Sequence, residues 1–325
     1  MSTTTEPVQH PYLNGLPESQ RPPGWEDDVR EIRAWLKTMP HIPNITDEHI
    51  IMFLHSCYGK IEKTKATIKC YYSVRTRWPE LFGQRDLLLP ELQKTLDLAN
   101  LVPLPTPTPE GYRVLLYRMT EYDPSKMHFV TCLKLFFMWN DICLAEDGLV
   151  PGYVVVFDMT GVSWGHLMRI SLPAIRKFMI YIQDAHPARL KGVHVINTVA
   201  FMDRVLAIVK PLMKSELVQL LHLHGPVESL ARFMPLSILP EDYGGDAETS
   251  QTLHDRRRHL METRYLQWFQ AEEQLKMDYS KRPNKRQPQQ QPAQQPEVRQ
   301  QPPPSLPPVQ TCEEVESSFR SLSID

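Results

Sequence analysis

Apolar residues recur at steps of three and four positions through the first third of the chain. Between residues 25 and 39 the apolar positions are Trp25, Val29, Ile32, Trp35 and Leu36. This spacing places them on one face of a helix. Three further segments before residue 100 share the pattern, and Thr46 is the expected N-cap of the first of these. The sequence therefore predicts an all-helical module over residues 25–100.

Short apolar runs rich in β-branched residues alternate with helical patterns after residue 111. The expected strands are 112–119, 153–159 and 192–197, with a short strand or turn over 221–225. The expected helices are 124–147, 172–186 and 198–221. Pro211 is expected to break the last of these helices. Strands that alternate with helices are typical of a largely parallel sheet, so we predict an α/β domain.

Proline-rich and glutamine-rich stretches mark the boundaries of these units. We expect a flexible N-terminus over 1–24, the helical module over 25–100, a Pro-rich connector over 101–111, the α/β domain over 112–246, a C-terminal helix over 247–280 and a tail over 281–325. The tail has almost no large apolar residues, so it cannot bury enough surface to offset its ordering entropy. We expect it to be disordered, and its sequence identifies no partner.

Composition excludes several functional classes. The 325 residues carry a formal net charge of −2, which provides no basic field for nucleic acid. No phosphate-binding glycine loop occurs, so no nucleotide or other cofactor is predicted. The N-terminal residues lack the apolar core of a signal peptide, and no run reaches the ~20 apolar residues of a membrane span. A cytoplasmic location is expected.

No metal site is predicted. The five cysteines form no C-x-x-C pair. His222 and His224 share one side of an extended segment, but no third ligand is spaced near them. Structural and catalytic zinc sites need at least three protein ligands. The two histidines are therefore interpreted as a pair without a metal.

One pentapeptide, "GVSWG", has the G-x-S-x-G spacing of a serine-hydrolase nucleophile elbow around Ser163. That motif requires the serine to follow its strand directly, with an oxyanion hole from an earlier loop and an acid and histidine later in the chain. Here Asp158, Met159 and Thr160 separate the strand from Gly161. We therefore interpret the glycines as loop residues, predict no catalytic residue and keep a hydrolase using Ser163 as a remote alternative.

Several segments taken in order resemble one family. They are "VLLYRMTEYDP", "FDMTGVSWGH", "HPARLKGVHVIN", "LHLHG" and "LPEDYGG". Together they resemble the CRAL-TRIO (Sec14-like) lipid-transfer family, and within it the branch of α-tocopherol transfer protein and cellular retinaldehyde-binding protein. The resemblance covers residues 25–270. It implies a helical module followed by an α/β lipid-binding domain with a mobile gate helix, and a carrier without enzymatic activity.

The family's pattern implies which residues enclose the ligand. The expected pocket residues are Trp139, Asn140, Val162, Trp164, Phe178, Tyr181, Ile182, Leu190 and Val193. The polar groups nearby are Asn140, Ser163, Tyr181 and His186. An apolar pocket with few hydrogen-bonding groups suits a lipid with a single polar head. Tocopherol, retinoid, carotenoid and phospholipid all fit this description.

The gate is expected within the helical segment that follows the third strand. Its apolar stripe consists of Phe201, Val205, Ile208 and Leu212, with Met202 and Val209 at the margins. An ordinary surface helix packed on a core has the same pattern. If the helix is a gate, opening it exposes apolar surface, so a membrane favours the open state. Peripheral association with endosomal or other internal membranes is therefore expected.

Some members of this branch also bind phosphoinositides through a basic patch beside the gate. Arg189 and Lys191 match two positions of that patch. The other two positions hold Glu216 and Leu220, with Lys210 and Lys214 nearby. A solvated sheet edge also explains the first pair. Two neighbouring functions stay open: a phosphatidylinositol/phosphatidylcholine transfer protein, and a membrane-docking adaptor whose tail recruits partners.

Overall fold

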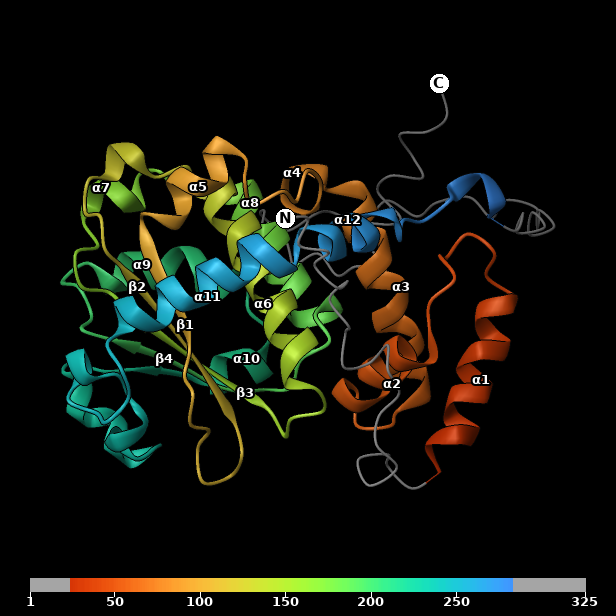
Figure 1. The fold of residues 1–325 in the computed structure, drawn as a ribbon, viewed down its shortest axis with the longest axis horizontal. Coiled ribbons are helices and arrows are strands. Elements are labelled where there is room, and N and C mark those ends of the chain that lie inside the picture. Colours follow the sequence, from red (N-terminus) through yellow and green to blue (C-terminus); the bar gives the residue numbers. More distant parts are fainter. Residues whose placement is uncertain (1–23, 283–325) are drawn as a thin grey trace, which may run out of the picture.

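The computed structural model describes residues 24–282, so the expected flexible N-terminus and the Gln/Pro-rich tail lie almost entirely outside the described residues. The first part of the chain forms helices α1 (Trp25–Lys37), α2 (Asp47–Ser56), α3 (Ile61–Arg77), α4 (Pro79–Phe82) and α5 (Pro90–Leu96). Thr46 caps α2, because its side chain accepts a hydrogen bond from the backbone N–H of His49. In Figure 1, α1 to α3 form one end of the molecule and the sheet forms the other.

A single five-stranded sheet follows, with its strands in chain order. The strands are β1 (Ala99–Pro103), β2 (Arg113–Met119), β3 (Tyr153–Asp158), β4 (Leu190–Ile196) and β5 (Leu221–Leu223). β1 pairs antiparallel with β2, and the pairs from β2 to β5 are parallel. The predicted α/β fold class with a mostly parallel sheet is confirmed.

Helices connect the parallel strands. The connection from β2 to β3 is α6 (Phe129–Asp147). The connection from β3 to β4 consists of α7 (Trp164–Leu167), α8 (Leu172–Ile180) and a π-helical turn (Tyr181–Ala185). The connection from β4 to β5 consists of α9 (Met202–Val209), a 3-10 turn (Lys210–Leu212) and α10 (Ser215–Gln219). The predicted break at Pro211 is present, because that residue lies in the 3-10 turn. The helix expected over 172–186 instead ends at Ile180 and continues as the π-helical turn.

The connector expected over 101–111 is wrong at its start, because β1 extends to Pro103. Leu101 lies opposite Tyr117 in the antiparallel ladder. β1 is an edge strand, where proline is tolerated because one row of backbone donors needs no partner. The strand is short and ends in proline, so its sequence resembles that of a linker.

The single C-terminal helix expected over 247–280 is also wrong. The chain forms α11 (Ser250–Arg264) and α12 (Leu266–Gln274), with a turn at Tyr265 between them. α11 crosses the front of β1 in Figure 1, where the Leu101 backbone N–H donates to Nδ1 of His254 over 3.2 Å. The turn at Tyr265 lets Trp268 and Phe269 pack into the same buried cluster as Met261.

The two faces of the sheet have different coverings. Val154, Val156 and Ile196 point to one face, where they pack against Leu230 and Met234 from the segment after β5. Side chains at alternate positions of the same strands point to the other face, toward α6 and the gate region. This second face forms the floor of the cavity described below.

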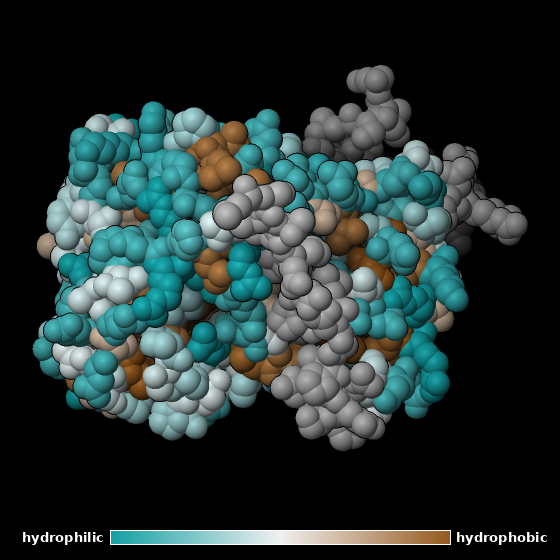
Figure 2. All heavy atoms as spheres, in the orientation of Figure 1, coloured by the Kyte–Doolittle hydropathy of each residue, from teal (hydrophilic) through white to brown (hydrophobic). Residues whose placement is uncertain are grey.

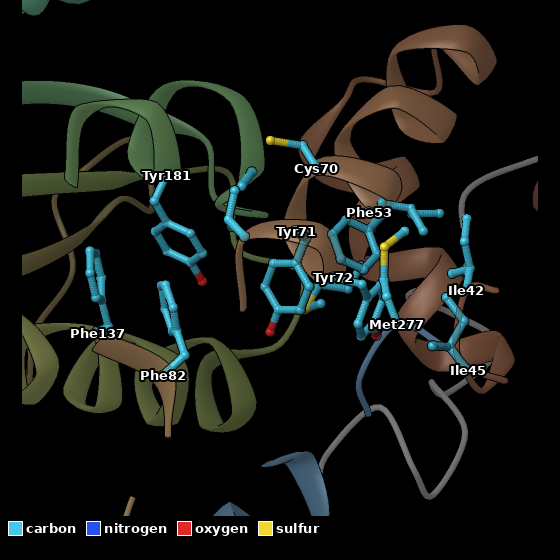
Figure 3. Close-up of a cluster of buried hydrophobic side chains, with 14 of the residues drawn as sticks. Ile42, Ile45, Phe53, Cys70, Tyr71, Tyr72, Phe82, Phe137, Tyr181 and Met277 are labelled. Atoms are coloured by element: carbon cyan, nitrogen blue, oxygen red, sulfur yellow. The ribbon is translucent and has the colours of Figure 1, made fainter. Parts of the chain in front are cut away.

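An aromatic cluster joins the helical module to the α/β domain. Tyr181 lies 4.7 Å from Phe137 and 4.8 Å from Phe82 between ring centroids. Figure 3 shows these rings facing one another, with Tyr71 and Phe53 continuing the cluster into the module. The module and the domain therefore share one core.

The outer face seen in Figure 2 is mostly hydrophilic, and its hydrophobic patches are small and separated. Within residues 24–282, none of the helices combines the length and the apolar composition that a membrane crossing requires.

Candidate functional site

A cavity of about 480 Å³ lies between the sheet and the gate region. Its floor is formed by side chains of β2, β3 and β4, namely Leu115, Tyr117, Val155, Phe157, Val193 and Val195. α6 and α8 form its walls, and α9 with α10 covers it. Nearly all of the lining is apolar, which is the character of a site for a hydrophobic molecule.

Most of the pocket residues expected from the sequence line this cavity. They are Asn140, Val162, Phe178, Ile182, Leu190 and Val193. They come from α6, the loop before α7, α8 with its π-helical turn, and β4. The sheet and its crossover helices therefore bring together residues that are more than fifty positions apart.

Three expected pocket residues lie elsewhere, and those expectations are wrong. Trp139 is fully buried on the opposite side of α6, where it stacks on the His254 ring at 5.3 Å. Tyr181 is buried in the aromatic cluster, and its hydroxyl accepts a hydrogen bond from Arg75 over 2.9 Å. Trp164 is 49% exposed on α7 and packs edge-on against Phe201. α6 and the π-helical turn are buried on several sides, so their apolar patterns do not indicate which side faces the cavity.

The face of α9 that covers the cavity differs from the expected stripe. Val205 lines the cavity, whereas Phe201, Ile208 and Leu212 do not. The lining residues of this segment are Met202, Val205, Leu206, Val209, Met213 and Leu217. The helix begins at Met202, after Phe201, and is apolar on more than one side. Both stripes fit a 3.6-residue period, so only the packing selects one.

The part of the expected gate segment between α9 and α10 is held by the π-helical turn. The side-chain amide of Gln183 donates to the Leu212 carbonyl over 3.1 Å, and its oxygen accepts from the Lys214 backbone N–H over 2.6 Å. Asp184 forms an ion pair with the Lys214 ammonium group. We call these contacts of Gln183 and Asp184 the gate latch. The sequence pattern did not reveal it, because a π-helical turn has no distinct apolar period.

Three of the segments that carry the family resemblance meet at Asp158. Its carboxylate accepts hydrogen bonds from Thr160 at 2.7 Å, from Asn197 at 2.9 Å and from Tyr243 at 2.7 Å. Burial raises the pKa of Asp158, but these hydrogen bonds outweigh it and hold the pKa below its usual range. Asp158 therefore ties the carboxyl ends of β3 and β4 to the segment that contains Tyr243.

Ser163 lies in a capping box rather than in a catalytic triad. Nδ1 of His166 accepts from the Ser163 backbone N–H over 3.0 Å and lies 2.9 Å from the Ser163 hydroxyl oxygen. Nε2 of His166 is buried without a hydrogen-bond partner among the described residues, so no carboxylate orients this ring. Gly161 adopts φ 80°, and a Cβ there would clash with the Tyr122 ring. Each of these residues has a structural role in the loop.

The expected histidine pair belongs to a larger cluster on the sheet face away from the cavity. Nδ1 of His194 lies 2.9 Å from Nε2 of His224, and His222 stacks on His194 at 5.0 Å. Phe233 packs on these rings, with its centroid 4.6 Å from that of His194. Within residues 24–282, no group of three His, Cys, Asp or Glu side chains has a metal-binding arrangement.

The basic residues expected to contact phosphoinositides lie in two places. Arg189 donates to the His55 carbonyl over 2.7 Å and stacks on the Tyr58 ring, and Lys191 donates to the Tyr58 hydroxyl over 3.0 Å. Lys214 is in the gate latch, and Lys210 is exposed at the 3-10 turn. Arg189 and Lys191 thus face the loop between α2 and α3.

Two family models match the chain along its length. A model described as "CRAL/TRIO domain" matches residues 99–245, which includes every strand of the sheet and the cavity floor. The chain contains a CRAL-TRIO domain. The expected family membership is therefore confirmed. A second model, described as "Pinta-like, UBA domain", matches residues 21–92, the helical module that precedes the CRAL-TRIO domain.

Similar proteins extend over most of the chain. A Homo sapiens protein named "Alpha-tocopherol transfer protein-like" is 29% identical over 235 residues, which is 71% of this chain and 68% of the relative. "Clavesin-1" of Xenopus laevis is 22% identical and covers 70% of each chain. The solved structure titled "Crystal structure of Sfh5" aligns with a TM-score of 0.49 at 13% identity, over 70% of this chain and 81% of that one. The family assignment supports lipid binding and transfer as the general class of function.

Proposed function

We propose that this CRAL-TRIO protein is a non-enzymatic carrier that binds one hydrophobic molecule and transfers it between membranes. The observation that carries the proposal is the cavity of about 480 Å³ with its nearly continuous apolar lining. The relatives named for tocopherol transfer favour a tocopherol-like, retinoid-like or similar lipid as cargo.

The energy of burial is sufficient for a carrier. Enclosing ~400 Å² of apolar ligand surface at ~25 cal/mol/Å² gives a gross gain near ~10 kcal/mol, before the costs of association are subtracted. The remaining affinity suits a ligand that is held in water and released at a membrane.

We propose that α9 and α10 form the gate and that a membrane favours its open state. Several large apolar side chains beside the gate support this: Trp164 is 49% exposed, Met168 70% and Leu172 59%. Trp164 also contacts Phe201 at the start of the gate, with ring centroids 5.6 Å apart. Insertion of these side chains into a bilayer would bring the gate close to an apolar phase. Exposing the apolar inner face of the gate there costs less free energy than exposing it to water.

We further propose that anionic lipids, phosphoinositides among them, assist this docking. Lys210 is exposed at the 3-10 turn of the gate, and Lys214, between that turn and α10, has a side chain that is 37% exposed. A phosphate group that recruits Lys214 would compete with Asp184 and so weaken the gate latch. In this proposal Arg189 and Lys191 contribute only after leaving Tyr58. The protein would act in the cytoplasm and associate with endosomal or other internal membranes for as long as exchange takes.

A transfer assay tests the proposal. Donor vesicles containing fluorescent α-tocopherol analogue are mixed with acceptor vesicles containing a quencher, with and without the full-length protein. The protein should accelerate quenching in proportion to its concentration. The variant Val155→Asp, which places a carboxylate in the cavity floor, should fail to accelerate it, and the circular dichroism spectrum of the variant establishes that it is folded. Transfer that is equal for this variant and the wild type would contradict a carrier that uses this cavity.

A further inference from the structure

His186 is a cavity residue whose ring nitrogen Nδ1 has no hydrogen-bond partner among the described residues. It follows the π-helical turn directly, and its side chain lines the cavity. Its Nδ1 is shielded from solvent and has no hydrogen-bond partner among the described residues. An unpaired buried polar atom lowers stability, so such atoms are uncommon unless something else bonds to them.

The other polar side chains that line the cavity are already bonded. Asn140 donates to the Phe136 carbonyl over 2.7 Å and accepts from the Tyr117 hydroxyl over 3.1 Å. Tyr153 donates to Asp147. Arg118 pairs with Asp242 at 2.7 Å, and Asp158 accepts from Tyr243 over 2.7 Å. Within residues 24–282, His186 is therefore the lining residue whose side chain is left to bond a ligand.

The surroundings of His186 favour an uncharged partner. Burial lowers the pKa of His186, Asp141 opposes this and Arg75 adds to it. The resulting pKa is about 4, so the ring is neutral at pH 7. Arg75 and Arg85 both pair with Asp141 behind the aromatic cluster. Neither guanidinium is available to an anionic head group in the cavity. A neutral imidazole offers one N–H donor and one nitrogen acceptor, which a hydroxyl group matches in either tautomer.

We propose that His186 anchors the head of the ligand, and that the cavity selects a lipid alcohol or phenol over the corresponding ether, carboxylate or phosphodiester. This inference rests on the proposed carrier function and narrows its ligand class. The hydroxyl would bond an imidazole nitrogen while the chain lies over Phe178 and Ile182, which line the same cavity. The π-helical turn that carries the gate latch thus also positions the head-group contact.

A displacement assay on the full-length protein tests this inference. Diphenylhexatriene, an uncharged probe without hydrogen-bonding groups, reports occupancy of the apolar cavity through its fluorescence. Oleyl alcohol, oleyl methyl ether and oleate then compete with it at pH 7. The wild type should bind the alcohol about tenfold more tightly than the ether or the carboxylate, as expected for one buried hydrogen bond.

Three variants complete the design. His186→Phe should bind the ether as tightly as the wild type does and lose the preference for the alcohol. His186→Gln keeps hydrogen-bonding groups and should retain part of that preference. His259→Phe, which makes the same change at an exposed histidine of α11 outside the cavity, should leave the preference unchanged. Uptake of diphenylhexatriene by each variant shows that its cavity is intact.

The outcomes separate the two proposals. If wild type and variants take up neither diphenylhexatriene nor any oleyl lipid, the carrier function fails and the inference fails with it. If the probe binds and the wild type does not discriminate the alcohol from the ether, only the His186 inference is overturned. Preference for oleate, or a preference for the alcohol that persists in His186→Phe, overturns it as well.

Discussion

At the scale of single residues, Asp141 is the buried charge on which the junction of module and domain depends. Arg75 from α3 donates to it at 2.6 Å, and Arg85 from the loop before α5 also pairs with it. Burial raises the pKa of Asp141, but the two guanidinium groups outweigh it and hold the pKa below its usual range. The ion pairs therefore connect three separate segments in the interior.

Removal of the Asp141 carboxylate should strongly destabilise the protein. Asp141→Ala leaves two guanidinium groups buried without their anion, which lowers the free energy of unfolding by about 3–5 kcal/mol. Urea denaturation measures this. The control is Asp27→Ala, whose partner Arg30 has a side chain that is 76% exposed, and it should change stability little. Equal effects of the two substitutions would show that the buried ion pairs of Asp141 contribute no more to stability than the exposed pair of Asp27.

His186 should make the folded protein sensitive to mild acid. Its pKa in the folded state is about 4, below the ordinary value of 6.5, so the unfolded chain binds more protons. Stability is therefore lost as the pH falls from 6.5 toward 4. His186→Phe removes this contribution, and its melting temperature should fall less than that of the wild type between pH 7 and 5. Ile182→Val serves as the matched control. A decrease in melting temperature as large in His186→Phe as in the wild type would show that His186 does not cause the sensitivity to acid.

The single residues of the cavity were expected from the family's pattern rather than from periodicity. β4 is buried on both faces, and Val193 lines the cavity as that pattern implied. α6 is buried on opposite sides, so Asn140 faces the cavity and the adjacent Trp139 faces His254. Hydrophobicity alone cannot separate two buried faces, and this explains why Trp139 and Tyr181 were misplaced.

At the scale of elements, the segment that we propose as the gate is held by a few polar contacts between α9 and α10. The ion pair of Asp184 with Lys214 is partly exposed, with side-chain exposures of 19% and 37%. Such pairs contribute about 0.2–1 kcal/mol. The gate latch is thus weak enough to break at a membrane surface.

Weakening the gate latch should speed ligand exchange. Asp184→Asn removes the ion pair with Lys214 and should raise the rate of vesicle-to-vesicle transfer by up to about fivefold. The matched control is Glu80→Gln, which removes the similarly exposed ion pair of Glu80 with Lys177 between α4 and α8. A transfer rate that is unchanged in Asp184→Asn, or raised equally in the control, would exclude the gate latch as a brake on opening.

The elements themselves were largely predictable, and the exceptions share a cause. The parallel strands β2, β3 and β4 and the helices between them follow clear periods. β1 is a five-residue strand that ends in Pro103, and the π-helical turn continues α8 without a change of pattern. Both are fixed by neighbours distant in the sequence, through the ladder with β2 for β1 and through contacts with Lys214 for the turn.

At the scale of the whole molecule, the exposed apolar side chains beside the gate form the expected membrane contact. Trp164 belongs to α7, and Leu172 begins α8. Trp164→Ala should reduce co-sedimentation with liposomes severalfold and leave diphenylhexatriene binding unchanged, because Trp164 does not line the cavity. Leu88→Ala, an exposed apolar residue before α5, is the control. Equal loss in both variants would remove Trp164 from the docking surface.

We propose that this protein holds one lipid in the cavity beneath α9. Native mass spectrometry of the purified full-length protein, followed by organic extraction and identification of the released molecule, tests it most directly. We expect a single hydrophobic ligand with a hydroxyl head, at nearly one molecule per chain. A protein that is empty as purified, and stays empty after incubation with candidate lipid alcohols, would contradict it.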